Sequence, residues 1–489
     1  MSAAETDART SAGELEGLRG RFARATARVT PGAIVYSASG LFALLFAAAT
    51  ALEFRAYKGQ RLDLGDMTQA VWATAHGHFL RVTGENGHEY VRLGVHVDPF
   101  LALLAPLWWI WPSPLMIPVV QAVTVASGAL PVYWLARKRL GDERAAAGFA
   151  AAYLVYPATQ FNALTNSGPH AVSFAVPLIL FAIWFLDNDR LVPFGIMAVL
   201  AATTKEEIPL AVGCLGIWYA VTHGRRLVGG AIFALGLGAT LVDFLVVIPH
   251  FSGSATPFQG RYAAVGGTPG GIGHTLLTHP GTLIAEATSS GKPHFLLLLF
   301  LPVVGLCLLE PLLLLGAVPD LAVNLLSSHP PQTMIGYQYT AGMVPFVIAA
   351  AVFGAARFRR VAPARLALYV VVLTAAFAGA HTPLTTAYHQ LPAARGSNPL
   401  REAKAHALSL VPAGAPVAAT NQFGGYLSAR RYISIFPQLG NAEWAVVDRN
   451  DPDYTIAGNS AAALHRLEAS PNWRVVYASR GLTVLQKRQ

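Results

Sequence analysis

Long apolar stretches alternate with short polar segments along most of this chain. Most of these stretches approach the roughly 20 residues that an α-helix needs to cross a membrane. The pattern predicts a mainly α, polytopic membrane protein with about eleven spans. The expected spans are residues 33–54, 114–136, 145–163, 172–186, 191–204, 208–222, 227–249, 295–309, 311–326, 339–356 and 366–381.

The polar segment after the first span, residues 55–113, is expected to be a large outer loop that carries surface helices. Its last part, 97–111, is apolar but shorter than a span, and Pro99 and Pro106 interrupt it. Proline removes a backbone donor and disfavours a continuous helix. We therefore interpret 97–111 as an interfacial or re-entrant helix.

The composition changes after the predicted transmembrane domain, residues 33–381. From 382 to 489 the apolar runs shrink to the length of strands and alternate with helical patterns, the first of which Asn398 can cap. This predicts a small, extracytoplasmic C-terminal α/β domain. Its expected strands are 416–419, 431–436, 443–447, 473–477 and 482–485, and its expected helices lie near 399–410 and 459–469.

Composition and charge agree with a membrane protein. Only 12% of the residues are charged and 54% are hydrophobic, whereas soluble domains carry about 25% charged residues. A net charge of +9 would also suit a nucleic-acid-binding protein. The basic residues, however, gather between apolar stretches at 137–144, 223–226 and 357–365, as in cytoplasmic loops. We therefore expect a lipid bilayer as the partner and no nucleic acid.

These basic clusters also set the expected orientation. Residues 1–32 are expected to form a cytoplasmic tail, and the C-terminal domain is expected to lie outside the plasma membrane. The first apolar run is longer than the apolar part of a signal peptide, so we expect it to stay as a span. The two cysteines, Cys214 and Cys307, both fall in apolar segments. They exclude a disulfide framework and a four-cysteine zinc site.

Two acids follow the first span directly. Asp63 and Asp66 stand at the start of an expected short helix, with Asp63 in the position of an N-cap. A carboxylate in a partly dry cleft can act as a general base. The alternative is that Asp63 only caps the helix and Asp66 is solvated. An apolar face predicts that this helix lies along the bilayer surface, and it is made by Met67, Val71 and Phe79.

Other polar side chains collect on the same expected side of the membrane. Asp243 and Asp320 lie within expected spans, near their outer ends. Ionisable groups inside a span are costly and usually line a cavity or pair with one another. Their placement predicts an aqueous cavity that opens outward. Further candidates near this cavity are His96, His170, Lys205, Glu206, Arg261, Tyr262, Tyr337 and Tyr339.

Each candidate has a functional and a structural interpretation. Lys205 can hold a phosphate while Glu206 orients it, or both can belong to a solvated turn. His96 with Asp98 can bind phosphate or a metal, or Asp98 can simply cap the helix that follows. His170, at the mouth of a span, suits either a ligand or an interfacial hydrogen bond.

The long outer loop and the aromatic residues leave similar alternatives. Arg261, beside Tyr262, can clamp a phosphate with two parallel hydrogen bonds or contact lipid headgroups. Tyr337 and Tyr339 precede a span, where an aromatic belt is usual and sugar stacking is the alternative. No spacing of histidines matches a zinc pattern, so we predict no structural metal site.

Four short motifs resemble those of a known group of membrane enzymes. They are Asp63-Leu64-Gly65 with Gln69 and Trp72, His96-x-Asp98-Pro99, Lys205-Glu206-Glu207, and Tyr337-x-Tyr339 with Pro345. Together with the expected topology, they resemble the GT-C superfamily of integral-membrane glycosyltransferases, and within it an uncharacterised family of predicted membrane proteins. The C-terminal domain resembles that of the aminoarabinose and mannosyl branches.

The resemblance implies a polyprenyl-phosphate sugar as donor and an inverting transfer to an acceptor hydroxyl at the outer membrane face. It implies that Asp63 is the base, with Asp66 as a further candidate, and the superfamily's second outer acid falls near His170 here. Lys205, with Arg261 or His96, is expected to stabilise the departing polyprenyl phosphate. The acceptor can be a glycan, a lipid or a protein. A divalent metal is compatible with this chemistry and is not required by the sequence.

Two other classes of protein fit an outward-facing polar cavity. A transporter or lipid flippase has such a cavity, but it tends to show internal repeats and ionisable groups near the bilayer midplane. A non-catalytic assembly protein would use the C-terminal domain as a binding surface. We find no internal repeat in the sequence, and the acids cluster at the outer rim. These observations favour the enzyme.

Overall fold

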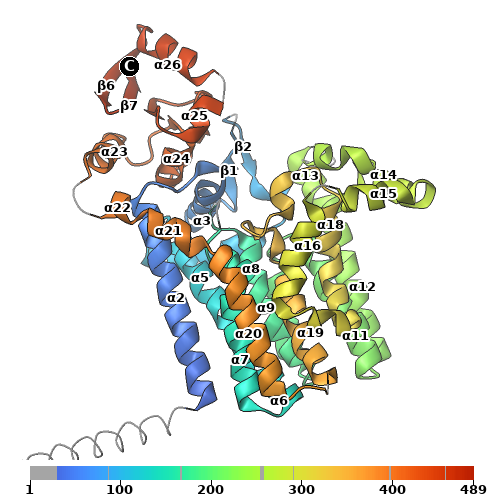
Figure 1. Cartoon of the computed structure of the whole chain (residues 1–489). Helices are drawn as coiled ribbons and strands as arrows, with labels where there is room; N and C mark the ends of the chain where they lie inside the picture. The colour runs from blue at the N-terminus through green and yellow to red at the C-terminus, as the bar shows by residue number, and fades with distance from the viewer. Residues whose placement is uncertain are drawn as a thin grey trace, which may run out of the picture.

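The protein is a bundle of helices with a small α/β domain over one end (Figure 1). The computed structural model describes residues 30–85, 87–165, 168–253, 258–289, 291–358, 360–395, 398–456 and 459–488. The expected cytoplasmic tail, 1–32, lies outside the described residues up to position 29.

The helices of the bundle lie where the apolar pattern predicts them. The first half contains α2 (Pro31–Arg55), α5 (Met116–Ser127), α6 (Ala129–Leu140), α7 (Glu143–Val155), α8 (Pro157–Ala163), α9 (Ala175–Leu186), α10 (Leu191–Ala202) and α11 (Ile208–Thr222). The second half contains α12 (Arg226–Val242), α13 (Ile248–Ser252), α16 (Lys292–Phe300), α17 (Pro311–Leu314), α18 (Val318–Leu325), α19 (Val344–Arg357) and α20 (Pro363–Ala380).

Four continuous helical segments among the described residues are long and apolar enough to cross a membrane, and shorter apolar helices accompany them. The four are Pro31–Arg55, Met116–Leu140, Arg226–Ser252 and Pro363–Ala394. At the centre of the bundle, α19 is buried along nearly its whole length, from Val344 to Ala355. A helix that is apolar all round is stable only when neighbouring helices or lipid surround it.

The outer loop 55–113 folds into small elements. It contains a π-helical turn, η1 (Arg61–Gly65), then α3 (Asp66–Ala75), strands β1 (Arg81–Thr83) and β2 (Glu89–Val91), and the helices η2 (Arg92–Gly94), η3 (Pro99–Leu104) and α4 (Ala105–Ile110). The two strands form an antiparallel hairpin. The sequence of this hairpin shows no alternating pattern from which its strands could be predicted.

Two expectations for this loop are wrong. Asp63 does not cap the helix, because it lies inside the π-helical turn and α3 begins three residues later. The apolar face of α3 is not turned to a bilayer surface, because Met67 and Val71 are buried with Leu101 in a core that the loop shares with the ends of bundle helices. Phe79, expected on the same face, is 52% exposed. The apolar face is present, but protein covers it instead of lipid.

The C-terminal domain has the predicted α/β character. Asn398 caps the first helix by accepting hydrogen bonds from the backbone N–H groups of Leu400 and Arg401. The five strands form one sheet in the order β4-β3-β5-β7-β6, in which β4, β3 and β5 run parallel. The elements are α23 (Pro399–Ser409), β3 (Val417–Ala419), α24 (Asn421–Gly424), β4 (Ile433–Ile435), β5 (Trp444–Asp448), α25 (Pro452–Ile456), α26 (Ser460–Glu468), β6 (Trp473–Ser479) and β7 (Leu482–Lys487).

Candidate active site

A cavity of about 1010 Å³ lies at the end of the helix bundle, and Ile435 lines it from the C-terminal domain. It contains nearly all of the predicted site residues, although they come from six separate segments. Its lining includes Asp63, Asp66, His96, His170, Lys205, Glu206, Arg261, Tyr262 and Tyr339. Tyr337 is not part of the lining. Asp243 and Asp320 are not part of it either, although their neighbours Phe244 and Ala322 are.

The closest pair of candidate catalytic groups is Asp63 and His170. Nε2 of His170 lies 3.0 Å from Oδ1 of Asp63, and the two side chains are 13% and 21% exposed. Nδ1 of His170 lies 3.1 Å from the carbonyl oxygen of Gly168. Gln121 fixes the backbone of His170 by accepting a hydrogen bond from its N–H at 2.9 Å.

The oxygen atoms around His170 determine how its protons are arranged. A carbonyl oxygen can only accept, so Nδ1 of His170 donates to Gly168. Nε2 then faces a carboxyl oxygen, and a hydrogen bond there needs a second proton. This proton is carried either by an imidazolium or by the carboxyl group of Asp63. A hydrogen bond through this proton holds the ring of His170 against the carboxyl group of Asp63.

Gly168 makes this pairing sterically feasible. Its φ is +119°, a conformation that residues with a side chain rarely adopt. A Cβ atom at this position would lie 3.2 Å from both the Cβ of Asp63 and the backbone nitrogen of Leu64. Glycine thus allows the segment before His170 to pass close to the π-helical turn.

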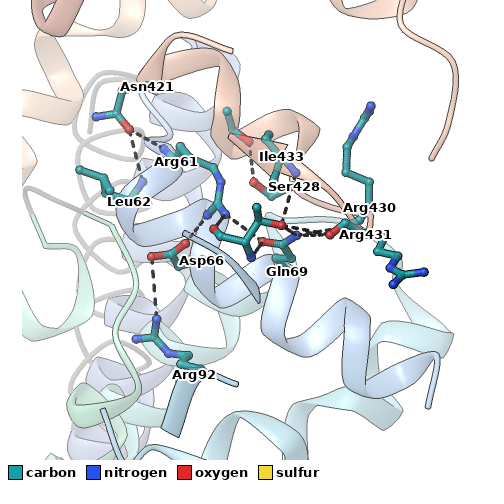
Figure 2. A network of polar contacts seen from close by, with 12 residues as sticks. Arg61, Leu62, Asp66, Gln69, Arg92, Asn421, Ser428, Arg430, Arg431 and Ile433 are labelled. Atoms are coloured by element: carbon teal, nitrogen blue, oxygen red, sulfur yellow. Dashed lines mark hydrogen bonds and ion pairs between the residues drawn. The ribbon is translucent and has the colours of Figure 1, made fainter. Parts of the chain in front are cut away.

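Asp66 points to a different set of partners (Figure 2). It forms an ion pair with Arg61, and its second oxygen lies 3.9 Å from Nη1 of Arg92. Arg92 in turn binds Asp98 at 2.8 Å. The expectation that Asp98 caps the following helix is wrong, because its carboxylate makes no capping hydrogen bond there. Two guanidinium groups lie beside Asp66, so its carboxylate has a structural function. A catalytic role would have to be performed by this same, already paired carboxylate.

His96 and Glu206 connect the outer loop to the turn between α10 and α11. Glu206 accepts a hydrogen bond from the backbone N–H of Val97 at 3.0 Å, and its other oxygen lies 3.0 Å from Nδ1 of His96. Burial opposes ionisation of this carboxyl group, but the charge of His96 and its hydrogen bond outweigh burial and lower the pKa of Glu206 to about 2. Glu206 therefore positions His96 rather than Lys205.

The depressed pKa of Glu206 predicts how the protein responds to acid. Because the folded-state pKa lies below the ordinary value of 4.5, Glu206 stabilises the fold fully above about pH 4.5. That contribution is lost as the pH falls towards about 2. Glu206→Gln removes the titrating group, so its thermal unfolding midpoint should fall less than that of the unmodified protein between about pH 6 and pH 3. Parallel pH curves for the two proteins would contradict this assignment.

Lys205 forms an ion pair with the following acid instead. Its Nζ lies 2.5 Å from Oε1 of Glu207, and it sits 5.8 Å from the centre of the Tyr339 ring. Although burial acts in the opposite direction, the carboxylates of Glu207 and Glu206 raise the pKa of Lys205 above its ordinary value. Lys205 is therefore a permanent positive charge in the cavity wall, already partly neutralised.

The ion pair between Lys205 and Glu207 allows a structural role of Lys205 to be separated from a catalytic role. Lys205→Met should destabilise the protein by about 3–5 kcal/mol, because it leaves the buried Glu207 unpaired. The double variant Lys205→Met/Glu207→Gln removes both charges and should recover most of the lost thermal stability. If the double variant folds but has lost the protein's activity, Lys205 or Glu207 has a role beyond this ion pair. Equal unfolding midpoints of the single and double variants would contradict the pairing.

Arg261 differs from the other cations of the cavity. Its guanidinium lies 4.2 Å from the centre of the Phe258 ring, and the ring of His96 stacks on the same phenyl group at 5.2 Å. Two hydrogen bonds from Ser328 to the carbonyl oxygen of Arg261 hold its backbone. Among the residues that the structure describes, no carboxylate forms an ion pair with Arg261. Its charge is thus available to a ligand.

In the described part of the chain, no three His, Cys, Asp or Glu side chains converge as they would around a metal ion.

The sequence gave no reason to select Arg92, although it lines the cavity and pairs with both Asp66 and Asp98. A single arginine in a polar segment carries no pattern, and only the fold brings it to these acids.

The helical bundle, the capping α/β domain and the cavity between them define an integral membrane protein of the GT-C glycosyltransferase fold. The profile described as "Predicted membrane protein (DUF2079)" matches residues 59–484, and the chain belongs to this family. The predicted relationship to a family of predicted membrane proteins is thereby confirmed, and the fold resembles that of a GT-C glycosyltransferase. No curated protein matches this chain.

Among the solved structures that resemble the chain are two GT-C glycosyltransferases. The crystal structure of ArnT from Cupriavidus metallidurans bound to undecaprenyl phosphate is 14% identical, covers 92% of this chain and 98% of that one, and gives a TM-score of 0.51. The apo state of the same protein gives 0.50 with the same coverage. The Archaeoglobus fulgidus oligosaccharyltransferase, in complex with Zn and sulfate, covers 86% of this chain and 69% of its own at a TM-score of 0.46.

Proposed function

We propose that this protein is a glycosyltransferase that moves a sugar from a polyprenyl-phosphate donor to an acceptor hydroxyl, with inversion at the anomeric carbon. The observation that carries the proposal is the Asp63–His170 pair, which faces a cavity that also contains Arg261, a cation with no carboxylate partner among the described residues. The fold supports it, because ArnT has the same fold and was crystallised with undecaprenyl phosphate. In this proposal the cavity opens to the outer face of the plasma membrane and the C-terminal domain is extracytoplasmic.

The proposed reaction is a single displacement. The acceptor oxygen forms a bond to the anomeric carbon while the bond from that carbon to the phosphate oxygen breaks. The acceptor's proton passes to the carboxylate of Asp63, and the polyprenyl phosphate leaves with the electron pair. His170, whose Nε2 lies 3.0 Å from Oδ1 of Asp63, orients the carboxylate. Attack opposite to the leaving group inverts the configuration.

The cations of the cavity supply the second half of the mechanism. Arg261 presents a planar guanidinium that can bind two phosphate oxygens at once. Lys205 and His96 add positive charge to the same wall, each held by a glutamate. Fixed charges of this kind stabilise the negative charge that develops on the departing phosphate. Tyr339, beside Lys205, offers an aromatic face to a sugar.

Binding of the lipid product tests this assignment of the cavity. Undecaprenyl phosphate should raise the thermal unfolding midpoint of the purified protein in detergent, because a ligand that binds only the folded state stabilises it. Undecaprenol, which lacks the phosphate, should have a much smaller effect. Equal shifts for the two lipids would indicate that only the polyprenyl chain is recognised and would contradict a phosphate site.

Proteoliposomes separate the transferase from a transporter. A transferase should release free undecaprenyl phosphate from an undecaprenyl-phosphate sugar and leave the lipid in its original leaflet. Movement of the intact lipid-linked sugar between leaflets, with no release of undecaprenyl phosphate, would identify a flippase and refute the proposal.

A further inference from the structure

The sheet of the C-terminal domain has a crevice of a kind that usually binds ligands. Strand β3 pairs in parallel with β4 on one side and with β5 on the other. Ligands of open parallel sheets bind outside the carboxyl ends of the strands where the strand order reverses in this way. At this edge, Asn421 follows β3, while Asp451 and Asp453 follow β5. The crevice contains a segment of the protein's own outer loop.

The segment in the crevice is the beginning of the π-helical turn that carries Asp63. Oδ1 of Asn421 accepts hydrogen bonds from the backbone N–H groups of Arg61 at 2.9 Å and Leu62 at 3.3 Å (Figure 2). The first N–H groups of any helical turn have no partner within it. Gln60, which occupies the cap position, makes no side-chain hydrogen bond to them. Asn421 therefore caps the turn from a position 360 residues away in the sequence.

The orientation of the Asn421 amide is fixed by an acid behind it. Nδ2 of Asn421 donates to Oδ2 of Asp453 at 2.6 Å. Asp451 supports this arrangement by accepting hydrogen bonds from the backbone N–H groups of Gln422 at 2.8 Å and Asp453 at 3.0 Å. Asn421 is 4% exposed. Its oxygen must therefore face the outer loop, because its nitrogen is committed to Asp453.

A second set of contacts clamps the same loop further along. Nε2 of Gln69 donates to the carbonyl oxygens of Arg430 and Arg431, each at 3.0 Å. Oε1 of Gln69 accepts from Nη2 of Arg61 at 2.8 Å. Gly424 lies so close to Arg61 that a Cβ atom there would collide with the arginine side chain. The loop around Asp63 is thus held by the C-terminal domain at both of its ends.

We propose that the C-terminal domain positions the general base, with Asn421 as the positioning residue that caps the turn carrying Asp63. This rests on the proposed function of Asp63 as the base. Residue 63 directly follows the two N–H groups that Asn421 binds, so loss of the cap lets the turn open and moves the carboxylate away from His170 and the acceptor. Asn421 itself does not line the cavity.

Hydrogen exchange and transfer kinetics of the full-length protein test this proposal together. Asn421→Ala should speed amide exchange of the peptide 59–66 at least about tenfold, because it removes the partner of two N–H groups. It should lower kcat for transfer by about 100-fold, the effect of a small misplacement of a catalytic group. The KM for the lipid donor and the binding of undecaprenyl phosphate should stay unchanged. The matched control is Asn441→Ala, which alters an exposed asparagine of the same domain.

Exchanging donor and acceptor distinguishes the cap from a general loss of stability. Asn421→Asp keeps an oxygen that can accept the two hydrogen bonds, but it places a carboxylate against that of Asp453. The two negative charges repel each other, so this variant should lose the cap as Asn421→Ala does. The double variant Asn421→Asp/Asp453→Asn restores every hydrogen bond with the donor and acceptor exchanged, and should recover slow exchange and most of kcat. Unchanged exchange in Asn421→Ala, or no recovery in the double variant, would overturn the proposal. If exchange responds as expected but the unmodified protein shows no transfer, the cap stands and the proposed function fails.

Discussion

Replacing Asp63 with Asn is expected to lower sugar transfer by about 10²–10⁴-fold, the usual contribution of a general base. Asparagine has nearly the same shape and can still form a hydrogen bond with Nε2 of His170, 3.0 Å away in the unmodified protein. It cannot take up the proton of the acceptor hydroxyl. The fold should therefore remain intact while the chemistry stops. Radiolabelled sugar transfer in membranes, normalised to the amount of protein, measures the loss.

A binding control shows that the loss in Asp63→Asn is chemical. The variant should still be stabilised by undecaprenyl phosphate, because the proposed phosphate contacts are made by other residues, Arg261, Lys205 and His96. Asp66→Asn serves as the matched control, because it replaces the second acid of the same loop. Asp66 pairs with Arg61 and Arg92, so its loss should lower thermal stability more than Asp63→Asn does. Transfer by Asp63→Asn at the unmodified rate would refute the assignment of the base.

Arg261→Gln is expected to reduce transfer by about 10²–10³-fold, because it removes a charge that stabilises the departing phosphate. Among the described residues, Arg261 is the cation of the cavity that has no carboxylate partner, so its replacement leaves no acid unpaired. Folding should change little. Arg261→Lys should recover part of the rate, since a lysine supplies charge but not two parallel hydrogen bonds.

The affinity for lipid phosphate separates a direct contact of Arg261 from an indirect effect. Arg261→Gln should weaken the stabilisation by undecaprenyl phosphate, and undecaprenol should bind as before. Arg81→Gln is the control, because Arg81 is an exposed arginine of the outer loop and does not line the cavity. A normal response of Arg261→Gln to undecaprenyl phosphate would show that the phosphate binds elsewhere and would shift the assignment to Lys205 and His96.

The helices could be predicted from the sequence because the apolar runs themselves define them. The runs 33–54 and 208–222 fall within a residue or two of α2 and α11. The strands of the C-terminal domain could be predicted for a similar reason, since short β-branched runs between turn residues leave few alternatives. The antiparallel hairpin β1–β2 escaped prediction because each of its strands is only three residues long. Its register depends on contacts with the C-terminal domain, such as those of Thr83 with Arg431.

The residues of the candidate site could be predicted from the sequence, but their partners could not. The acids and cations could be selected because charged residues near apolar segments are costly and need a reason. Their partners could not be assigned, because pairing depends on the fold. A helix cap was one of the two interpretations of Asp98, which instead binds Arg92. A glutamate was expected to orient Lys205, and only the fold shows that Glu207 pairs with it while Glu206 binds His96. The π-helical turn could not be predicted from the sequence either, because Asn421, which caps it, lies in another domain.

The most direct test is to incubate the purified protein in lipid nanodiscs with a panel of undecaprenyl-phosphate sugars and a membrane extract as the source of acceptor. Mass spectrometry then measures free undecaprenyl phosphate. We predict that at least one sugar donor yields undecaprenyl phosphate in an acceptor-dependent reaction, and that Asp63→Asn, which still binds the lipid, yields none above background. Release that is equal in the two proteins, or no release from any donor by a protein that binds undecaprenyl phosphate, would contradict a transferase with Asp63 as its base.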